Sequence, residues 1–293
     1  MKTKILMLIK QHPLIAFIVM AYAISWILWL VASNIDSLSN FLTWIGGFGP
    51  AIAAIILTPL LDGREGLRDL LSKAFRWRFH PLLYIAALGI PILGTVLLMI
   101  LYAVITNDFA SLQSLGNWLQ GLLRSSFMLV LTLIFGIVIV AGEEFGWRGF
   151  ALPKLQTKHG DLAASILVGL MWGLWHLPNL WPVNPKHEVQ DLLFFMADII
   201  VISVLYTWLY INSNESILLV SLFHSAYDLM VMYASASLPF LRKAHGYEFL
   251  VVLVFAALIV SIYGPKRFRF SPKNVDNKPN GMVPVQPAGN SSN

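Results

Sequence analysis

Two adjacent glutamates, Glu143 and Glu144, precede Arg148 in the sequence. On a helix, Glu144 and Arg148 are four residues apart and share a face, with the acid N-terminal to the base, which is the better order for an ion pair. Glu143 is rotated by about 100° from Glu144 and is free to face a different environment. We therefore expect Glu144 to be paired and Glu143 to be the reactive carboxylate. The alternative is that both acids only pair with Arg148 at a helix end.

Two histidines stand in similar four-residue arrangements elsewhere in the chain. Trp172 and His176 share a helix face, and Pro178 is expected to break or kink that helix just after the histidine. His224 and Asp228 also share a face, so the aspartate can orient the imidazole and fix its tautomer. The plainer interpretation is that each histidine only makes a hydrogen bond at a helix end or between packed helices.

The chemistry that fits the three groups together is hydrolysis. A carboxylate can act as a general base toward water, and imidazoles can hold that water or donate to a developing oxyanion. The chain has no cysteine, which excludes a thiol nucleophile, and no serine stands in an evident pairing with histidine. His187-Glu188 lacks the second histidine of a zinc-protease His-Glu-x-x-His motif. Tyr227-Asp228 lacks the Gly-x-Gly-Asp partner of intramembrane aspartyl proteases.

The composition places these groups in a membrane. Hydrophobic residues make up 57% of the chain and charged residues 12%, whereas soluble domains have about 25% charged residues. Eight apolar segments have roughly the 20 residues that a spanning helix needs, and the first of them is expected to be an uncleaved span. The fold class expected is therefore all-α, a polytopic membrane protein with about eight transmembrane helices. The segments cover roughly 14–33, 41–61, 82–106, 124–147, 162–181, 192–212, 216–237 and 247–264.

The distribution of Lys and Arg predicts the orientation. Most of these residues lie at the N-terminus, in the 62–81 loop, after Glu144 and at the end of the chain, which by this topology share one side of the membrane. The positive-inside rule makes that side, with both termini, cytoplasmic. The net charge of +5 then needs no nucleic-acid partner, because these side chains face anionic lipid headgroups. The other side holds only Arg124, Lys186, Arg242 and Lys243.

Two further parts of the chain carry expectations of their own. Residues 265–293 are rich in Lys, Asn, Pro and Ser, so we expect a disordered cytoplasmic tail after a helical membrane domain over 1–264. Asp198, in the sixth apolar segment, either lines a cavity or is solvated near the outer interface. We expect the second arrangement.

The three motifs together resemble the CPBP family, the CAAX proteases and bacteriocin-processing proteins that are also called the Abi family. Flanking sequences match as well, among them Trp-Arg-Gly after the glutamates, Trp-Gly-x-Trp-His-Leu-Pro around His176, and Gly-Phe-Gly-Pro at 47–50. The resemblance covers roughly residues 40–235. It implies an eight-helix bundle that encloses a conical intramembrane cavity.

The resemblance also implies a role for each motif residue and no cofactor or metal. Glu143 would be the catalytic base that activates water, and His176 would help to position that water. His224 and Asp228 would match the pair on the oxyanion side of the site. The supporting residues would be Glu144, Arg148 and Trp172.

This chain departs from the family pattern at two motif positions. Prenyl-protein endopeptidases of the family often have Asn where this chain has Asp228, and an amide can donate to an oxyanion whereas a carboxylate cannot. Asp228 is therefore either protonated or serves to orient His224. Trp172 stands where Phe is usual.

The function expected is an intramembrane endopeptidase that acts on a membrane-associated peptide or protein, lipid-modified or not, in a bacterial cell membrane. One alternative is a zinc protease with Glu143, His176 and His224 as ligands. Another is a non-catalytic immunity or scaffold protein. A third is a proton-coupled transporter, for which no inverted repeat is visible. The substrate, the cleavage site and the oligomeric state are not specified by the sequence.

Overall fold

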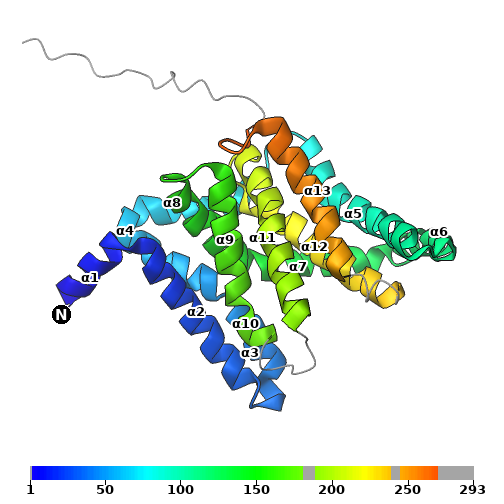
Figure 1. Cartoon of the computed structure of the whole chain (residues 1–293). Coiled ribbons are helices and arrows are strands. Elements are labelled where there is room, and N and C mark those ends of the chain that lie inside the picture. Colours follow the sequence, from blue (N-terminus) through cyan, green and yellow to red (C-terminus); the bar gives the residue numbers. More distant parts are fainter. Residues whose placement is uncertain (1, 181–188, 239–244, 270–293) are drawn as a thin grey trace, which may run out of the picture.

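A computed structural model of the chain describes residues 2–180, 189–238 and 245–269, and these form helices without a strand (Figure 1). The all-α fold class is thus confirmed for this part of the chain. Short turns are η1 (Asp36–Leu38), η2 (Lys73–Phe75), η3 (Phe109–Leu112) and the π-helical η4 (Trp147–Ala151). The α-helices are α1 (Lys2–Gln11), α2 (Pro13–Ala32), α3 (Ser39–Gly47), α4 (Gly49–Ser72), α5 (Leu82–Thr106), α6 (Gln113–Arg124), α7 (Ser126–Gly146), α8 (Leu152–Gln156), α9 (Asp161–Trp175), α10 (Leu177–Leu180), α11 (Val189–Asn212), α12 (Ile217–Ser237) and α13 (His245–Tyr263).

Each of the eight apolar segments lies on helix in the described residues, but a count of eight spans is not confirmed. Five helical stretches there are long and apolar enough to cross a membrane, or six if the bent pair of α3 and α4 counts as one span. The apolar parts of α9 and α13 are shorter. The 15 residues of α9 rise about 22 Å, against a hydrocarbon core of about 30 Å. The chain is an integral membrane protein of several spans.

Prolines set two of the breaks that shape the site. α9 ends at Trp175, three residues before Pro178, whose ring nitrogen has no hydrogen to donate to the carbonyl of Leu174. The break expected after His176 is therefore present. Pro50 stands in the first turn of α4, where α3 and α4 meet at an angle of 42°.

α11 and α12 form the centre of the bundle (Figure 1). α11 packs against α9, α12 and α13, and α12 packs against α7 and α5. The larger apolar core contains the buried side chains of Trp147, Trp175, Tyr206 and Phe223. The helices that carry the three motifs, α7, α9 and α12, therefore share one core.

The first residues of the expected tail are packed rather than disordered. The N–H groups of Asp161 and Leu162, at the start of α9, donate to the carbonyls of Lys266 and Pro265, each over 3.1 Å. Phe268 is fully buried, and its N–H donates to Asp161 Oδ2 over 2.8 Å. The first N–H groups of a helix need acceptors from outside the helix, and the tail supplies them for α9. Composition does not indicate such a contact, because the acceptors are backbone carbonyls. Residues 270–293 lie outside the described residues, so the prediction for them stays a prediction.

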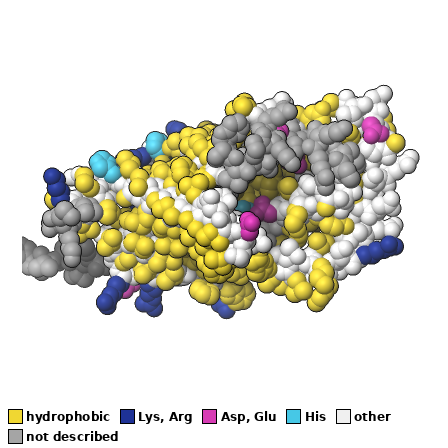
Figure 2. All heavy atoms as spheres, turned by 90° about the horizontal axis from the view of Figure 1, so that it is seen from below, with side chains coloured by type: hydrophobic (Ala, Val, Ile, Leu, Met, Phe, Trp, Pro, Cys, Tyr) yellow, Lys and Arg dark blue, Asp and Glu magenta, His cyan; other side chains and the backbone are white. Residues whose placement is uncertain are grey.

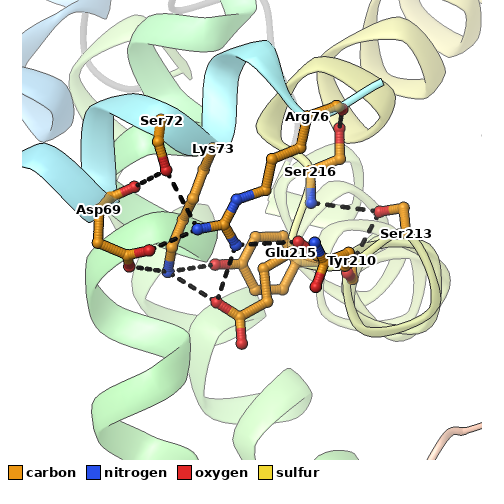
Figure 3. A network of polar contacts seen from close by, with 9 residues as sticks. Asp69, Ser72, Lys73, Arg76, Tyr210, Ser213, Glu215 and Ser216 are labelled. Atoms are coloured by element: carbon orange, nitrogen blue, oxygen red, sulfur yellow. Dashed lines mark hydrogen bonds and ion pairs between the residues drawn. The ribbon is translucent and has the colours of Figure 1, made fainter. Parts of the chain in front are cut away.

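A network of charged residues, which we call the clamp, fixes the start of α12 against the end of α4 (Figure 3). Lys73 Nζ lies 2.9 Å from Glu215 Oε2 and 3.5 Å from Asp69 Oδ2, and donates to Tyr210 Oη over 3.1 Å. Arg76 pairs with Asp69 and lies 3.7 Å from Glu215. The clamp consists of Asp69, Lys73, Arg76 and Glu215.

The turn that the clamp holds has an unusual backbone. Asn214 and Glu215 have φ values of 55° and 61°, in the left-handed region that disfavours residues with a side chain. Arg76 Nη1 donates to the carbonyl of Asn214 over 3.0 Å, and Ser216 Oγ donates to the carbonyl of Arg76 over 2.5 Å. Ser216 also caps α12 by accepting from the N–H of Leu219. The register of α12, and with it the height of His224, is therefore fixed from the α4 side.

Candidate active site

The end of α7 approaches the start of α4 closely. A Cβ atom at Gly146 would collide with Pro50, and one at Gly142 would lie 2.8 Å from the ring of Phe48. Glycine is therefore required for this contact, which brings the 47–50 stretch against the helix that carries the glutamates. Beyond Gly146 the helix widens into η4, and every residue of η4 is buried.

Glu144 is the centre of a buried group of charges. Its Oε1 atom lies 3.2 Å from Arg148 Nη1 and accepts from His224 Nδ1 over 2.8 Å. Glu144 and Arg148 have no exposed surface, and His224 is 4% exposed. The ion pair expected from the four-residue spacing is present, and it also holds the histidine of α12. We call Glu143, Glu144, Arg148 and His224 the interior cluster.

Two residues of α11 that the sequence did not single out complete the surroundings of Arg148. The guanidinium lies 4.4 Å from the ring of Tyr206 and 4.7 Å from that of Trp172, within the range of cation–π attraction. Its Nη2 atom donates to Ser203 Oγ over 3.3 Å. A tyrosine and a serine in an apolar span are ordinary, so only the fold could show that they face Arg148.

Glu143 faces a different partner from its neighbour, as its rotation on the helix predicts. Its Oε2 atom accepts a hydrogen bond from Trp172 Nε1 over 2.6 Å. This is its one side-chain hydrogen bond within the described part of the chain. The first and second motifs are thus joined directly, and the other oxygen of Glu143 is available to a further donor.

His176 lies just past the end of α9, beside the same tryptophan. Its Nδ1 atom is 2.9 Å from the carbonyl oxygen of Trp172. A carbonyl only accepts, so Nδ1 carries the hydrogen and Nε2 is the acceptor nitrogen of the neutral ring. The rings of Trp175 and Phe195 pack edge-on against it at centroid distances of 4.7 and 5.4 Å.

Asp228 forms the open edge of the group. Its Oδ2 atom lies 3.5 Å from His224 Nε2, and 58% of its side chain is exposed. His224 is therefore placed between two carboxylates, one buried and one open. The space-filling view in Figure 2 shows acidic side chains and a histidine beside a hollow in a mostly hydrophobic face.

Asp198 differs from the expectation of a solvated carboxylate. Its Oδ2 atom accepts from Tyr227 Oη over 3.0 Å, and its Oδ1 atom is buried without a hydrogen-bond partner among the described residues. Tyr227 precedes Asp228, so Asp198 lies against the helix of the third motif. The position of Asp198 in the sixth apolar segment did not predict its contact with Tyr227, because this contact depends on how α11 and α12 pack together.

The same geometry bears on the zinc alternative. Within the described residues, which include Glu143, His176 and His224, no three His, Asp or Glu side chains are close enough together to hold a metal ion. Glu143 has one oxygen hydrogen-bonded to Trp172 Nε1, whereas the hydrogen bond of His176 Nδ1 to a carbonyl leaves its Nε2 atom open, so the fit depends on the distances between the three side chains. The arrangement does not fit a set of zinc ligands.

Comparison with known proteins finds similarity to one class of enzyme. Residues 124–230, which contain all three motifs, match the family described as type II CAAX prenyl endopeptidase Rce1-like. The chain is also 25% identical over 234 residues to CAAX prenyl protease 2 of Methanococcus maripaludis, with 75% of this chain and 84% of that protein covered. These matches support the resemblance that the motifs indicate.

Proposed function

For this chain, a CAAX prenyl endopeptidase-like intramembrane protease that resembles the CPBP family, we propose that Glu143 activates the water that attacks the peptide bond. The observation that carries the proposal is that the two adjacent glutamates differ in their burial and in their hydrogen-bond partners. Glu144 is fully buried, with Arg148 and His224 both on its Oε1 atom and no partner among the described residues on Oε2. Glu143 is partly exposed and has one partner, Trp172, so water can reach it. A general base needs a free lone pair within hydrogen-bond reach of the water, and Glu143 has one.

The two histidines take different parts in this proposal. His176 is held by its Nδ1–H, so its Nε2 atom accepts a hydrogen bond from the attacking water. The proton that Glu143 takes from this water passes to the nitrogen of the leaving amine as the C–N bond breaks. His224 stands on the side where the oxyanion forms, and Glu144 orients its ring by accepting a hydrogen bond from Nδ1. Asp228, which is exposed and 3.5 Å from His224, serves to orient that ring rather than to donate to the oxyanion.

The substrate proposed is a peptide or protein that reaches the site from the membrane and carries a hydrophobic or lipid-modified end. The support is the name of the relatives and the hollow beside acidic side chains on an apolar face (Figure 2). We propose the orientation with both termini cytoplasmic, in a bacterial cell membrane. The support for that orientation is the distribution of Lys and Arg.

The test compares the wild-type protein with Glu143→Gln at equal levels in one host. Peptide termini in membranes and medium are mapped by mass spectrometry. We expect a set of termini that requires the wild-type protein and is absent with Glu143→Gln. A matched control is Glu65→Gln, at an exposed glutamate of α4, which should leave these termini unchanged.

Two outcomes would contradict the proposal in different ways. Identical termini with wild type and Glu143→Gln, both folded, would favour a non-catalytic immunity or scaffold role. Termini that disappear on treatment with a chelator and return with Zn²⁺ would favour the metalloprotease instead.

A further inference from the structure

A groove at one membrane face takes no part in the proposed reaction. It has a volume of about 570 Å³ and is lined by residues of the α1–α2 junction, α4 and the end of α8. The α2 span begins at Pro13 and the α7–α8 span ends at Gln156, and the groove is lined by residues next to both ends. It is therefore at the level where lipid headgroups meet the protein. Its cationic side chains are Lys10, Lys154 and Lys158.

The charges in this groove are not balanced. Lys154 Nζ lies 3.2 Å from Asp62 Oδ2, which is the one carboxylate in the lining. The side chains of Lys10 and Lys158 are exposed, and they make no hydrogen bond or ion pair within the described ranges. Two positive charges thus have no partner among the described residues, and His12 adds a further hydrogen-bonding group.

A second, apolar groove continues from the first along α2. It has a volume of about 490 Å³ and shares His12 and Ile15 with the cationic groove. Ile15, Val19 and Ala23 follow one another at intervals of four residues on one face of α2. This face extends about 12 Å away from the cationic groove, into the depth of the acyl chains.

We propose that the two grooves together bind one anionic phospholipid. Its phosphate lies among Lys10, Lys154 and Lys158, and an acyl chain lies along Ile15 and Val19. Neither groove alone identifies the ligand, but a cationic groove at headgroup height that opens into an apolar one matches a molecule with a phosphate and a hydrocarbon chain. A zwitterionic lipid has a cationic group of its own that would face these lysines.

The test uses the purified full chain in detergent and native mass spectrometry. Phosphatidylglycerol and phosphatidylcholine with the same acyl chains are added in turn. We expect the wild type to retain phosphatidylglycerol in preference, and Lys10→Gln/Lys158→Gln to weaken that binding by about tenfold or more. The control Arg267→Gln/Arg269→Gln removes the same charge from exposed positions outside the groove and should bind as the wild type does.

A second arm separates a lipid from a free phosphate and does not depend on the lysine variants. Val19→Trp fills the apolar groove without changing the charge and should also weaken retention of phosphatidylglycerol. Glycerol phosphate, which has the headgroup without acyl chains, should not compete at the concentrations that phosphatidylglycerol needs. Equal retention by Lys10→Gln/Lys158→Gln and the wild type would overturn the proposal. So would equal losses in the Arg267/Arg269 control, or competition by glycerol phosphate as strong as by the lipid.

Discussion

Two networks of charged side chains in the described residues join α12, or the turn before it, to another helix. In the interior cluster, Glu144 and Arg148 have no exposed surface and are enclosed by the rings of Trp172 and Tyr206. In the clamp, the side chains of Glu215 and Asp69 are 46% and 57% exposed. Water can reach both carboxylates of the clamp, although Lys73 itself is buried, whereas it reaches neither Glu144 nor Arg148 in the interior cluster. The interior cluster thus holds the candidate catalytic residues in place, and the clamp holds the turn before α12.

Within the interior cluster, the neighbouring residues Glu143 and Glu144 have different surroundings. Glu144 is fully buried beside Arg148 and His224, whereas Glu143 is partly exposed and accepts only from Trp172 among the described residues, although the two are adjacent in the sequence. In the clamp, each carboxylate is shared between the same two cations, Lys73 and Arg76. Glu143 therefore remains available as a base, whereas the two carboxylates of the clamp serve only in ion pairs.

The largest expected effect is on activity and follows from this division. Glu143→Gln keeps the size of the side chain and an oxygen that can accept from Trp172, but removes the base. We expect cleavage to fall by about 10²- to 10⁴-fold, with a Tm in detergent close to the wild-type value. Glu144→Gln should instead lower the Tm, because Arg148 would lose its buried counter-charge. Equal losses of activity at unchanged Tm for the two variants would contradict the division.

The next effect is on stability. Arg148→Met leaves the carboxylate of Glu144 buried without its cation, and we expect the free energy of unfolding to fall by about 3–5 kcal/mol. Denaturation in mixed detergent measures this change. Arg148→Lys restores the charge but not the planar contact with Trp172 and Tyr206, so it should recover only part of the loss. Full recovery with lysine would mean that charge alone matters at this position.

A smaller effect is expected where the first two motifs meet. Trp172→Phe keeps an aromatic ring beside Arg148 but removes the N–H that donates to Glu143. A hydrogen bond to a carboxylate contributes about 1.5–3 kcal/mol, so kcat should fall by roughly tenfold to a hundredfold. An unchanged kcat would show that this hydrogen bond does not position the base.

Local spacing predicted the contacts within a helix and missed those between helices. The pairing of Glu144 with Arg148 and the break after His176 follow from four-residue spacing and from Pro178. Spacing also paired His224 with Asp228, yet the shorter contact of His224 is to Glu144, on another helix. Composition placed the apolar segments on helices. Composition alone could not show that α9 is too short to count as a span, because it does not register the break near Pro178.

The partners of residues on different helices could not be predicted from the sequence, whether or not the residue itself had been singled out. Tyr206 lies against Arg148, Trp172 and His224, and Asp198 accepts from Tyr227. Nothing in the sequence of an apolar span distinguishes a tyrosine that faces a charge from one that faces lipid. Such contacts are set by the packing of α11 between its neighbours.

The smallest effect is expected in the clamp, where Glu215→Gln removes one carboxylate. Lys73 keeps Asp69 and Tyr210 as partners, and Glu215 is partly exposed, so the free energy of unfolding should fall by only about 0.2–1 kcal/mol. The change should shrink at high salt, because exposed charges are screened. Asp36→Asn, at an exposed position without an ion pair in the described residues, is the matched control. A loss as large as that of Arg148→Met would mean that the turn at Asn214 stores strain that only the clamp restrains, and the contrast between the two networks would fail.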